Sequence, residues 1–274
     1  MIEFPIPIVH NGTRYTKCDV VAPKTSAIAD TERESHKNIY SAMHVFISGG
    51  ISAIYAEEGQ TVEDPIQIKN ICRRMPYKTA EFVSLQIVLE IDPDDGFEGV
   101  YGCPRCGHKQ IAEYEDGADS RDHLSDMETR YMGSGEPAFD ITVDPPLEIK
   151  DKSTGEVIEA VTSLRMEYPT LGTCIAASGK YGASGGLRQQ FAFYVDSLLQ
   201  INGEEVDQKT RAQWGMYIFE NLRTGKQGPL AQVGREMRRY GMDQTIQKTC
   251  PSCGKVWWAD VDTSNFFGSA LRSL

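Results

Sequence analysis

The alternation of apolar and polar residues near the start of the chain predicts a β-hairpin. Two apolar segments, residues 5–9 and 15–21, flank the sequence His10-Asn11-Gly12-Thr13. An Asn-Gly pair between apolar segments is a strong signal for a tight hairpin turn. Pro5 and Pro7 cannot donate hydrogen bonds to a neighbouring strand, so we expect the first strand at the edge of its sheet.

Apolar residues at helical spacing follow the hairpin. One face of the first predicted helix consists of Ile39, Met43, Phe46 and Ile47. Gly49-Gly50 marks the end of this helix, and Asp64-Pro65 is typical of an N-cap followed by proline in the first helical position. We expect Thr79 to cap a further helix that runs through Leu89. A hairpin and short helices would then form an N-terminal domain.

The second half of the chain also mixes strand and helix patterns. Residues 112–138 are polar and acidic, which predicts an exposed loop. Period-two alternation over residues 139–149 and 157–166 predicts two strands joined by a turn at Ser153-Thr154-Gly155. Pro169 is expected to start a short helix. Three later apolar faces predict more helices: Phe191, Val195, Leu198 and Leu199; Trp214, Ile218 and Leu222; and Leu230, Val233, Met237 and Tyr240.

The strongest chemical signal is a repeated cysteine motif. Cys103-Pro104-Arg105-Cys106-Gly107 and Cys250-Pro251-Ser252-Cys253-Gly254 share the pattern C-P-x-C-G. The two-residue spacer lets both thiolates face one ion, and the glycine permits a left-handed turn that frees N–H groups for the sulfurs. We therefore predict that Cys103, Cys106, Cys250 and Cys253 bind one structural Zn²⁺ per chain in a zinc ribbon. Four sulfurs fill a tetrahedral shell, so no position stays open for a substrate.

The distance between the motifs predicts the domain organisation. Residues 107–249 separate them, whereas about 15 to 20 residues are common in such sites. We interpret the intervening chain as a domain inserted into the ribbon. The predicted units are an N-terminal hairpin and helical domain at 1–98, a split zinc ribbon at 99–115 and 245–262, an inserted, mostly helical α+β domain at 116–244 and a C-terminal tail at 263–274. The fold class is α+β.

Two other interpretations of the cysteines stay open at this point. Each pair could be an independent redox site, although neither pair begins a thioredoxin-like βαβ unit. The pairs could also belong to two zinc sites shared between the chains of a dimer.

Composition and charge narrow the classes of function. The chain has 28 Lys and Arg residues against 39 Asp and Glu residues, a net charge of −11, which argues against a general nucleic-acid binder. No apolar segment approaches the roughly 18 to 20 residues of a membrane-spanning helix, and no secretory signal is visible. Seven cysteines, an odd number, favour reduced thiols and a cytosolic protein over a disulfide framework.

The residues near the C-terminus include several candidates for partner binding. They are Trp257, Trp258, Phe266, Phe267, Leu271 and Arg272. Such residues either pack on the ribbon or contact another protein, because aromatic and Arg side chains dominate binding hot spots.

Several of these features together resemble a known group of proteins. They are the N-terminal hairpin before helices, the knuckle at Cys103, the sequence Arg239-Tyr240-Gly241 and the sequence Asn265-Phe266-Phe267. In this order they are similar to baseplate hub and tail-assembly proteins of contractile, T4-like bacteriophages. The second knuckle and the long insert depart from the single-knuckle pattern of that group.

The resemblance implies a non-enzymatic protein. Its partners would be other tail and baseplate proteins, or a second copy of itself, and not nucleic acid or membrane. It would act in the host cytoplasm during assembly or as part of the tail baseplate in the virion.

Two alternative functions follow from other residues. Arg105, His108, Lys109 and Lys255 at the ribbon tips, with Trp257 for base stacking, would suit a zinc-ribbon adaptor for nucleic acid in transcription or replication. The Gly-rich segment around Gly182 could hold a phosphate substrate of an enzyme, but it lacks the order of a P-loop.

Overall fold

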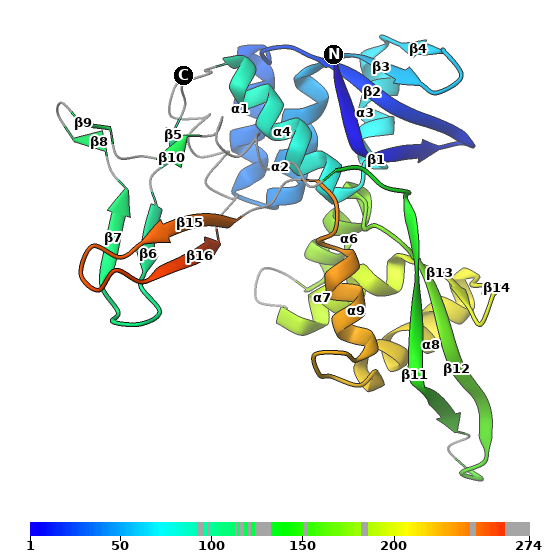
Figure 1. Cartoon of the computed structure of the whole chain (residues 1–274). Coiled ribbons are helices and arrows are strands. Elements are labelled where there is room, and N and C mark those ends of the chain that lie inside the picture. The colour runs from blue at the N-terminus through cyan, green and yellow to red at the C-terminus, as the bar shows by residue number, and fades with distance from the viewer. Residues whose placement is uncertain are drawn as a thin grey trace.

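The N-terminal hairpin is confirmed and forms the edge of a sheet. The computed structural model describes residues 1–91, 96–97, 99–112, 114–115, 118–119, 122–123, 133–150, 153–181, 186–241 and 245–260. Strands β1 (Ile2–His10) and β2 (Thr13–Val20) pair in antiparallel fashion, and β3 (Ile51–Ala56) and β4 (Thr61–Val62) continue the sheet in the order β1-β2-β3-β4. The strand that contains the prolines therefore lies at the edge, as predicted (Figure 1).

Four helices pack beside this sheet: α1 (Thr25–Ser35), α2 (Ile39–Gly49), α3 (Pro65–Arg73) and α4 (Tyr77–Ile91). Two begin at side-chain caps. Asn38 accepts hydrogen bonds from the N–H groups of Tyr40 and Ser41, and Asp64 accepts one from Ile66. We call β1–β4 and α1–α4 the N-terminal lobe.

Thr79 does not cap a helix, which corrects the sequence-based expectation. Helix α4 begins earlier, at Tyr77, whose N–H group donates to the Pro169 carbonyl at 2.8 Å. The hydroxyl of Thr79 donates to the carbonyl of Ile6 at 2.7 Å and accepts from the N–H group of Ile6 at 3.1 Å. Ile6 lies where the pairing of β1 with β2 is irregular, so Thr79 replaces the missing strand partner.

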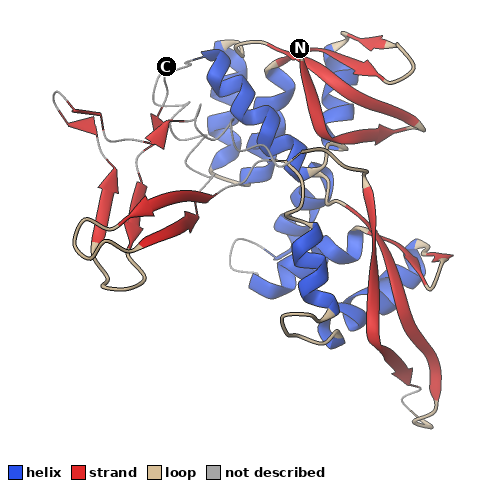
Figure 2. Cartoon of the chain, in the orientation of Figure 1, coloured by secondary structure: helices blue, strands red, loops and turns tan. Residues whose placement is uncertain are grey.

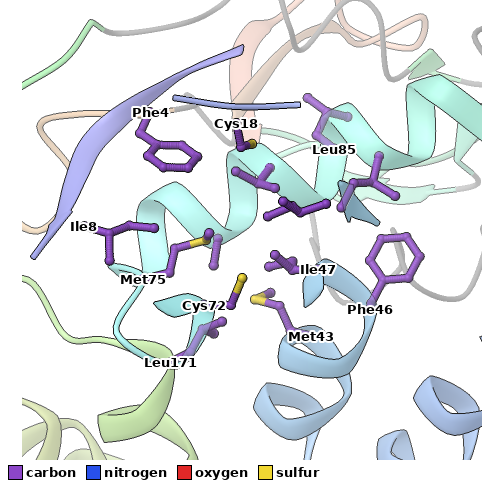
Figure 3. Packing of buried hydrophobic residues seen from close by; sticks show 14 of the residues in the cluster. Phe4, Ile8, Cys18, Met43, Phe46, Ile47, Cys72, Met75, Leu85 and Leu171 are labelled. Atoms are coloured by element: carbon purple, nitrogen blue, oxygen red, sulfur yellow. The ribbon is translucent and has the colours of Figure 1, made fainter. Parts of the chain in front are cut away.

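The core of the N-terminal lobe lies between the sheet and the helices (Figure 3). Phe4 and Ile8 of β1 lie on one side of this cluster, and Met43, Phe46 and Ile47 of α2 lie on the other. Two further cysteines, Cys18 and Cys72, are fully buried in this core. Burial raises the pKa of Cys72 to about 12, so its thiol stays protonated and packs as an apolar group.

A second lobe contains the predicted pair of long strands. Strands β11 (Ala138–Lys150), β12 (Val157–Glu167), β13 (Leu198–Ile201) and β14 (Glu204–Glu205) form a four-stranded sheet in that order. Helices α6 (Leu171–Tyr181), α7 (Gly186–Asp196), α8 (Gln208–Asn221) and α9 (Pro229–Glu236) complete the second lobe. A second hydrophobic cluster fills it and also includes Ile6 of β1.

Leu198 and Leu199 lie in strand β13 and not on the helical face with Phe191 and Val195. Helix α7 ends at Asp196, and Leu198 pairs with Met166 of β12. The missed signal is Asn202-Gly203, which has φ angles of 52° and 85° and turns β13 into β14. This is the same Asn-Gly turn chemistry that identifies the first hairpin.

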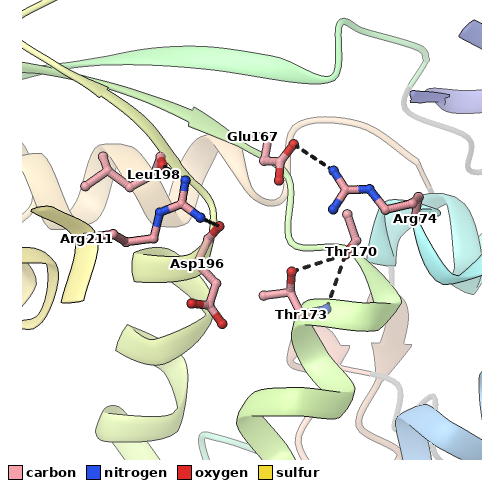
Figure 4. A network of polar contacts seen from close by, with 7 residues as sticks. All are labelled: Arg74, Glu167, Thr170, Thr173, Asp196, Leu198 and Arg211. Carbon is pink, nitrogen blue, oxygen red and sulfur yellow. Dashed lines mark hydrogen bonds and ion pairs between the residues drawn. The ribbon is translucent and has the colours of Figure 1, made fainter. Parts of the chain in front are cut away.

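Backbone and side-chain contacts join the two lobes (Figure 4). The N–H group of Leu171 donates to the Met75 carbonyl at 2.9 Å. Arg74 Nη2 lies 3.7 Å from Glu167 Oε2. Thr170 caps α6 by accepting the N–H group of Thr173 at 3.2 Å. The contacts of residues 74 and 75, between α3 and α4, with Glu167 and Leu171 therefore hold the second lobe against the first.

Two small hairpins carry the cysteine motifs (Figure 1), and Tyr101, Ile246 and Ala259 of these hairpins belong to the hydrophobic cluster of the N-terminal lobe. Strand β6 (Gly99–Gly102) pairs with β7 (Lys109–Ala112), and β15 (Thr245–Thr249) pairs with β16 (Val256–Asp260). We call these two hairpins the cysteine ribbon. The helices occupy the middle of the molecule, between the ribbon and the two larger sheets (Figure 2).

The described residues of the acidic segment 112–138 differ from the single exposed loop that we expect from the sequence. They include short strands: β8 (Tyr114–Glu115) pairs with β9 (Ala118–Asp119), and β10 (Asp122–His123) pairs with β5 (Gly96–Phe97). The α+β fold class is nevertheless as predicted. None of the described helices is long and apolar enough to cross a bilayer.

Candidate metal centre

The four predicted cysteine ligands meet in one cluster within a single chain. The sulfur atoms of Cys103, Cys106, Cys250 and Cys253 all lie within 4.8 Å of one another. Across the two motifs, the Sγ atoms of Cys103 and Cys253 are 3.7 Å apart and those of Cys106 and Cys250 are 3.6 Å apart. The two pairs therefore form one cluster, whereas the redox interpretation requires them to be independent of each other.

The two motifs fold in the same way because they have the same local sequence. In the first knuckle, the N–H group of Gly107 donates to the Cys103 carbonyl at 2.9 Å; in the second, that of Gly254 donates to the Cys250 carbonyl at 2.9 Å. Gly107 has a φ angle of 72° and Gly254 one of 69°, a left-handed conformation that strongly favours glycine. Each knuckle then returns into a strand that pairs with the one before it.

Contacts between the hairpins hold the knuckles together. Gln110 Nε2 of β7 donates to the carbonyl of Thr249 in β15 at 2.7 Å. Lys248 Nζ lies 4.5 Å from the centre of the Tyr101 ring. The sequence patterns do not single out Gln110 or Lys248. The available signal is their position in a strand next to a knuckle, where residues that face the other hairpin are expected to contact it.

The surroundings of the sulfurs favour the thiolate form of one ligand. Burial acts to raise the pKa of Cys103, but hydrogen bonds from the N–H groups of Cys106 and Arg105 and from the other thiols outweigh it, and its pKa falls to about 6. Cys103 and Cys250 are buried, whereas Cys106 is exposed. Thiolates are the form of cysteine that binds metal ions.

This donor set fits a tetrahedral metal ion. Bonds of about 2.3 Å from Zn²⁺ to sulfur at tetrahedral angles place the sulfurs about 3.8 Å apart, close to the 3.6 and 3.7 Å between the motifs. The four sulfurs could hold a metal ion without a large change in the chain. An ion bound by all four would have no open coordination position.

The outer face of β16 carries the largest exposed aromatic side chain of the described ribbon residues. Trp258 is 59% exposed and shares this face with Val256. Trp257 points the opposite way and packs, half-buried, against the hydrophobic cluster that includes Ile246 and Ala259. The candidates Phe266, Phe267, Leu271 and Arg272 lie outside the described residues.

Two alternative functions, nucleic-acid binding and phosphate binding, depend on residues in different parts of the chain. Arg105, His108, Lys109 and Lys255 are exposed at the tips of the ribbon. Trp258, and not Trp257, is the exposed tryptophan of β16. In the Gly-rich segment, α6 extends to Tyr181 and α7 begins at Gly186, and residues 182–185 between them lie outside the described part of the chain.

Comparison of the chain with models of protein families, with curated proteins and with solved structures finds no match. The resemblance to phage baseplate and tail-assembly proteins therefore rests on the sequence motifs alone.

Proposed function

We propose that this protein is a non-enzymatic baseplate hub or tail-assembly protein of a contractile-tailed bacteriophage, in which a structural Zn²⁺ closes the cysteine ribbon. The cluster of four thiols from two identical knuckles carries the proposal. A site with four sulfur ligands suits a structural role, because catalytic zinc sites keep one position for water or substrate. The type of partner comes from the sequence resemblance.

Zinc is the metal that this donor set favours. Four cysteine ligands in tetrahedral geometry select Zn²⁺ or iron–sulfur chemistry, and paired C-P-x-C-G knuckles are typical of structural zinc. When bound, the ion would supply no reaction. It would join residues 144 and 150 positions apart in the chain, and structural zinc sites contribute on the order of 10 kcal/mol to folding.

The first test measures metal content. The variants Cys103→Ser and Cys250→Ser should each lose about one zinc per chain and unfold at a lower temperature than the unaltered protein. The matched control is Cys174→Ala, since Cys174 is buried in α6 away from the cluster. Inductively coupled plasma mass spectrometry gives the metal and its amount. Unchanged zinc in both cysteine variants would disprove a shared site.

The second test concerns the partner. The outer face of β16 is our candidate contact surface, because Trp258 is 59% exposed and tryptophan is frequent at binding hot spots. Tail and baseplate proteins encoded beside this chain should co-purify with it when expressed together. Trp258→Ala should weaken this association while zinc content and melting temperature stay the same. The control is Ile66→Ala, a residue 72% exposed on α3.

A second candidate is a nucleic-acid adaptor, favoured by the exposed basic residues of the ribbon tips and by the exposed Trp258 in the same ribbon. Electrostatic binding to DNA or RNA weakens steeply with salt. Binding at low salt that is lost in Arg105→Gln and Lys109→Gln would support this function over the assembly role. An absence of binding to both nucleic acids at low salt would remove it.

A further inference from the structure

A cavity of about 280 Å³ lies between the two lobes, away from the cysteine ribbon. Helices α2 and α4 of the N-terminal lobe contribute to it, as do α6, α7 and α9 of the second lobe, which lie next to one another in Figure 1. We call it the interlobe cavity. Sites for small molecules are frequent between domains, with volumes of about 300 Å³ or more. Its size therefore suits a molecule with one or two rings.

Aromatic rings form much of the wall of the interlobe cavity. Tyr40 of α2 meets the ring of Tyr77 edge-on at 5.6 Å and that of Phe193 at 5.9 Å. Tyr168 is fixed by a hydrogen bond from its hydroxyl to the Glu236 carbonyl, and Tyr194 accepts one from Gln190. Aromatic pairs favour such edge-on and offset contacts. Rings held in this way offer preformed surfaces to a planar aromatic ligand.

The charged groups of the cavity leave an excess of positive charge. Lys78 Nζ lies 2.9 Å from Glu81 Oε2, and this buried ion pair is neutral overall. Arg238, just after α9, also lines the cavity, and its guanidinium has no ion pair or hydrogen bond with the side chains or backbone of the described residues. Arg238 is exposed. Its guanidinium can therefore contact an anion at the mouth, in the bidentate geometry that carboxylates and phosphates favour.

The neutral polar groups add donors and no negative charge. Burial raises the pKa of Tyr40 to about 12 and raises the pKa of Tyr194 as well, so both hydroxyls stay protonated near neutral pH. Burial also raises the pKa of Cys174, which lines the cavity. A protonated, buried thiol is a poor nucleophile, which favours binding over covalent chemistry.

We propose that the interlobe cavity binds a small planar aromatic molecule that carries an anionic group. The ring would lie against Tyr40, Tyr77 and Phe193, and the anionic group would face Arg238. This proposal does not depend on the metal or on the proposed assembly role, since its residues lie outside the cysteine ribbon. Because the cavity is formed by both lobes, a bound molecule would also stabilise their contact.

Titration calorimetry with 2-naphthoate tests the proposal on the full chain. Its neutral and cationic counterparts, 2-naphthylmethanol and 2-naphthylmethylamine, test the preference for an anion. We expect 2-naphthoate to bind most tightly. Failure of 2-naphthoate to bind at millimolar concentration, or equal or tighter binding of the amine, would overturn the proposal.

Two variants and a control locate the binding. Arg238→Gln should weaken 2-naphthoate binding about tenfold, the effect of losing one charge-assisted contact. The control Arg239→Gln should leave it unchanged, because Arg239 pairs instead with Glu236 at 3.1 Å. Gly234→Leu should abolish binding, since Gly234 lines the cavity and a larger side chain would fill it.

The space around Gly234 makes this variant usable. Among the described residues outside the neighbouring backbone, the only atom within 4 Å of a Cβ at Gly234 is Arg238 Nη2, at 3.7 Å. A melting curve of the Gly234→Leu protein checks its folding, and Arg238→Gln gives the result independently at an exposed position. Binding that survives both changes would place the ligand elsewhere and disprove the proposal.

Discussion

Two glycines in or next to helices show how differently single residues are constrained. Gly50 ends α2 against α4, and a Cβ there would lie 2.6 to 2.9 Å from three side-chain atoms of Ile87, which is fully buried. Gly234 lies inside α9, where the nearest atom that a Cβ would meet in the described part of the chain is Arg238 Nη2, at 3.7 Å. The first glycine is required by close packing of two helices, and the second is not.

Alanine at these two positions should therefore act in opposite directions. Gly50→Ala should lower the free energy of unfolding by about 1 to 3 kcal/mol, the usual cost of overpacking a core. Gly234→Ala should raise the free energy of unfolding by about 0.5 to 1 kcal/mol, because alanine has less conformational freedom than glycine in the unfolded chain and therefore loses less entropy on folding. Denaturant unfolding of both variants measures this. Equal effects of the two substitutions would contradict the packing argument.

The geometry of the cysteine cluster also depends on single residues. Each knuckle depends on two cysteines, one glycine and the hydrogen bonds between them. These contacts are local in sequence, which is why the motif alone identifies all four ligands. The partner of each sulfur in the other knuckle, in contrast, depends on how the two hairpins meet.

At the scale of elements, α4 is attached to strand β1 by one buried side chain. The hydroxyl of Thr79 forms hydrogen bonds with both the N–H and the carbonyl group of Ile6, and both residues are fully buried. Neither backbone group of Ile6 has a regular partner in β2 at this point. Thr79 therefore satisfies two polar groups that are shielded from water.

Removal of this hydroxyl should be costly. Thr79→Val keeps the shape of the side chain but leaves the N–H and carbonyl groups of Ile6 unpaired, which should lower the free energy of unfolding by about 1 to 3 kcal/mol. The control Thr79→Ser keeps the hydroxyl and should cost less. Denaturant unfolding compares the two variants, and an equal loss for Val and Ser would show that packing, and not hydrogen bonding, is responsible.

The pairing of strands explains why two of the predictions from sequence patterns were wrong. Leu198 and Leu199 continue the helical spacing of α7, yet they pair with β12 because the chain turns back at Asn202-Gly203. Trp257 and Trp258 are neighbours with similar chemistry, and only the strand alternation of β16 separates the packed ring from the exposed one. Which of the two tryptophans is buried therefore depends on which face of the hairpin packs against the hydrophobic cluster.

At the scale of the whole molecule, the contact between the lobes contains an ionisable group with an unfavourable environment. Burial raises the pKa of Glu167, and the charges of Arg74 and Arg211 reduce this effect only in part. The carboxyl group of Glu167 therefore binds its proton more tightly in the folded protein than in the unfolded chain. The ionised carboxylate costs stability as the pH rises through the pKa of the folded state.

The variant Glu167→Gln should consequently gain stability relative to the unaltered protein as the pH rises from about 4 to 7. Glu136→Gln is a control with the opposite sign, because a hydrogen bond from Arg14 lowers the pKa of Glu136. Its stability relative to the unaltered protein should fall as the pH rises toward about 5 and then stay constant, because this carboxyl ionises below its ordinary pKa. Denaturant unfolding at several pH values measures both trends, and a flat difference for Glu167→Gln would contradict the role of burial.

The features of this protein that depend on local interactions can be predicted from its amino-acid sequence. Turn residues specify the first hairpin, helical spacing and Asp64-Pro65 specify α2 and α3, and the C-P-x-C-G spacing identifies the four clustered cysteines. The surfaces that meet, in contrast, are seen in the folded structure alone. The attachment of α4 through Thr79, the exposure of Trp258 and the interlobe cavity all depend on contacts between residues far apart in the chain. Such contacts cannot be predicted from local spacing or from the chemistry of single side chains, because each contact depends on how all the surrounding elements pack.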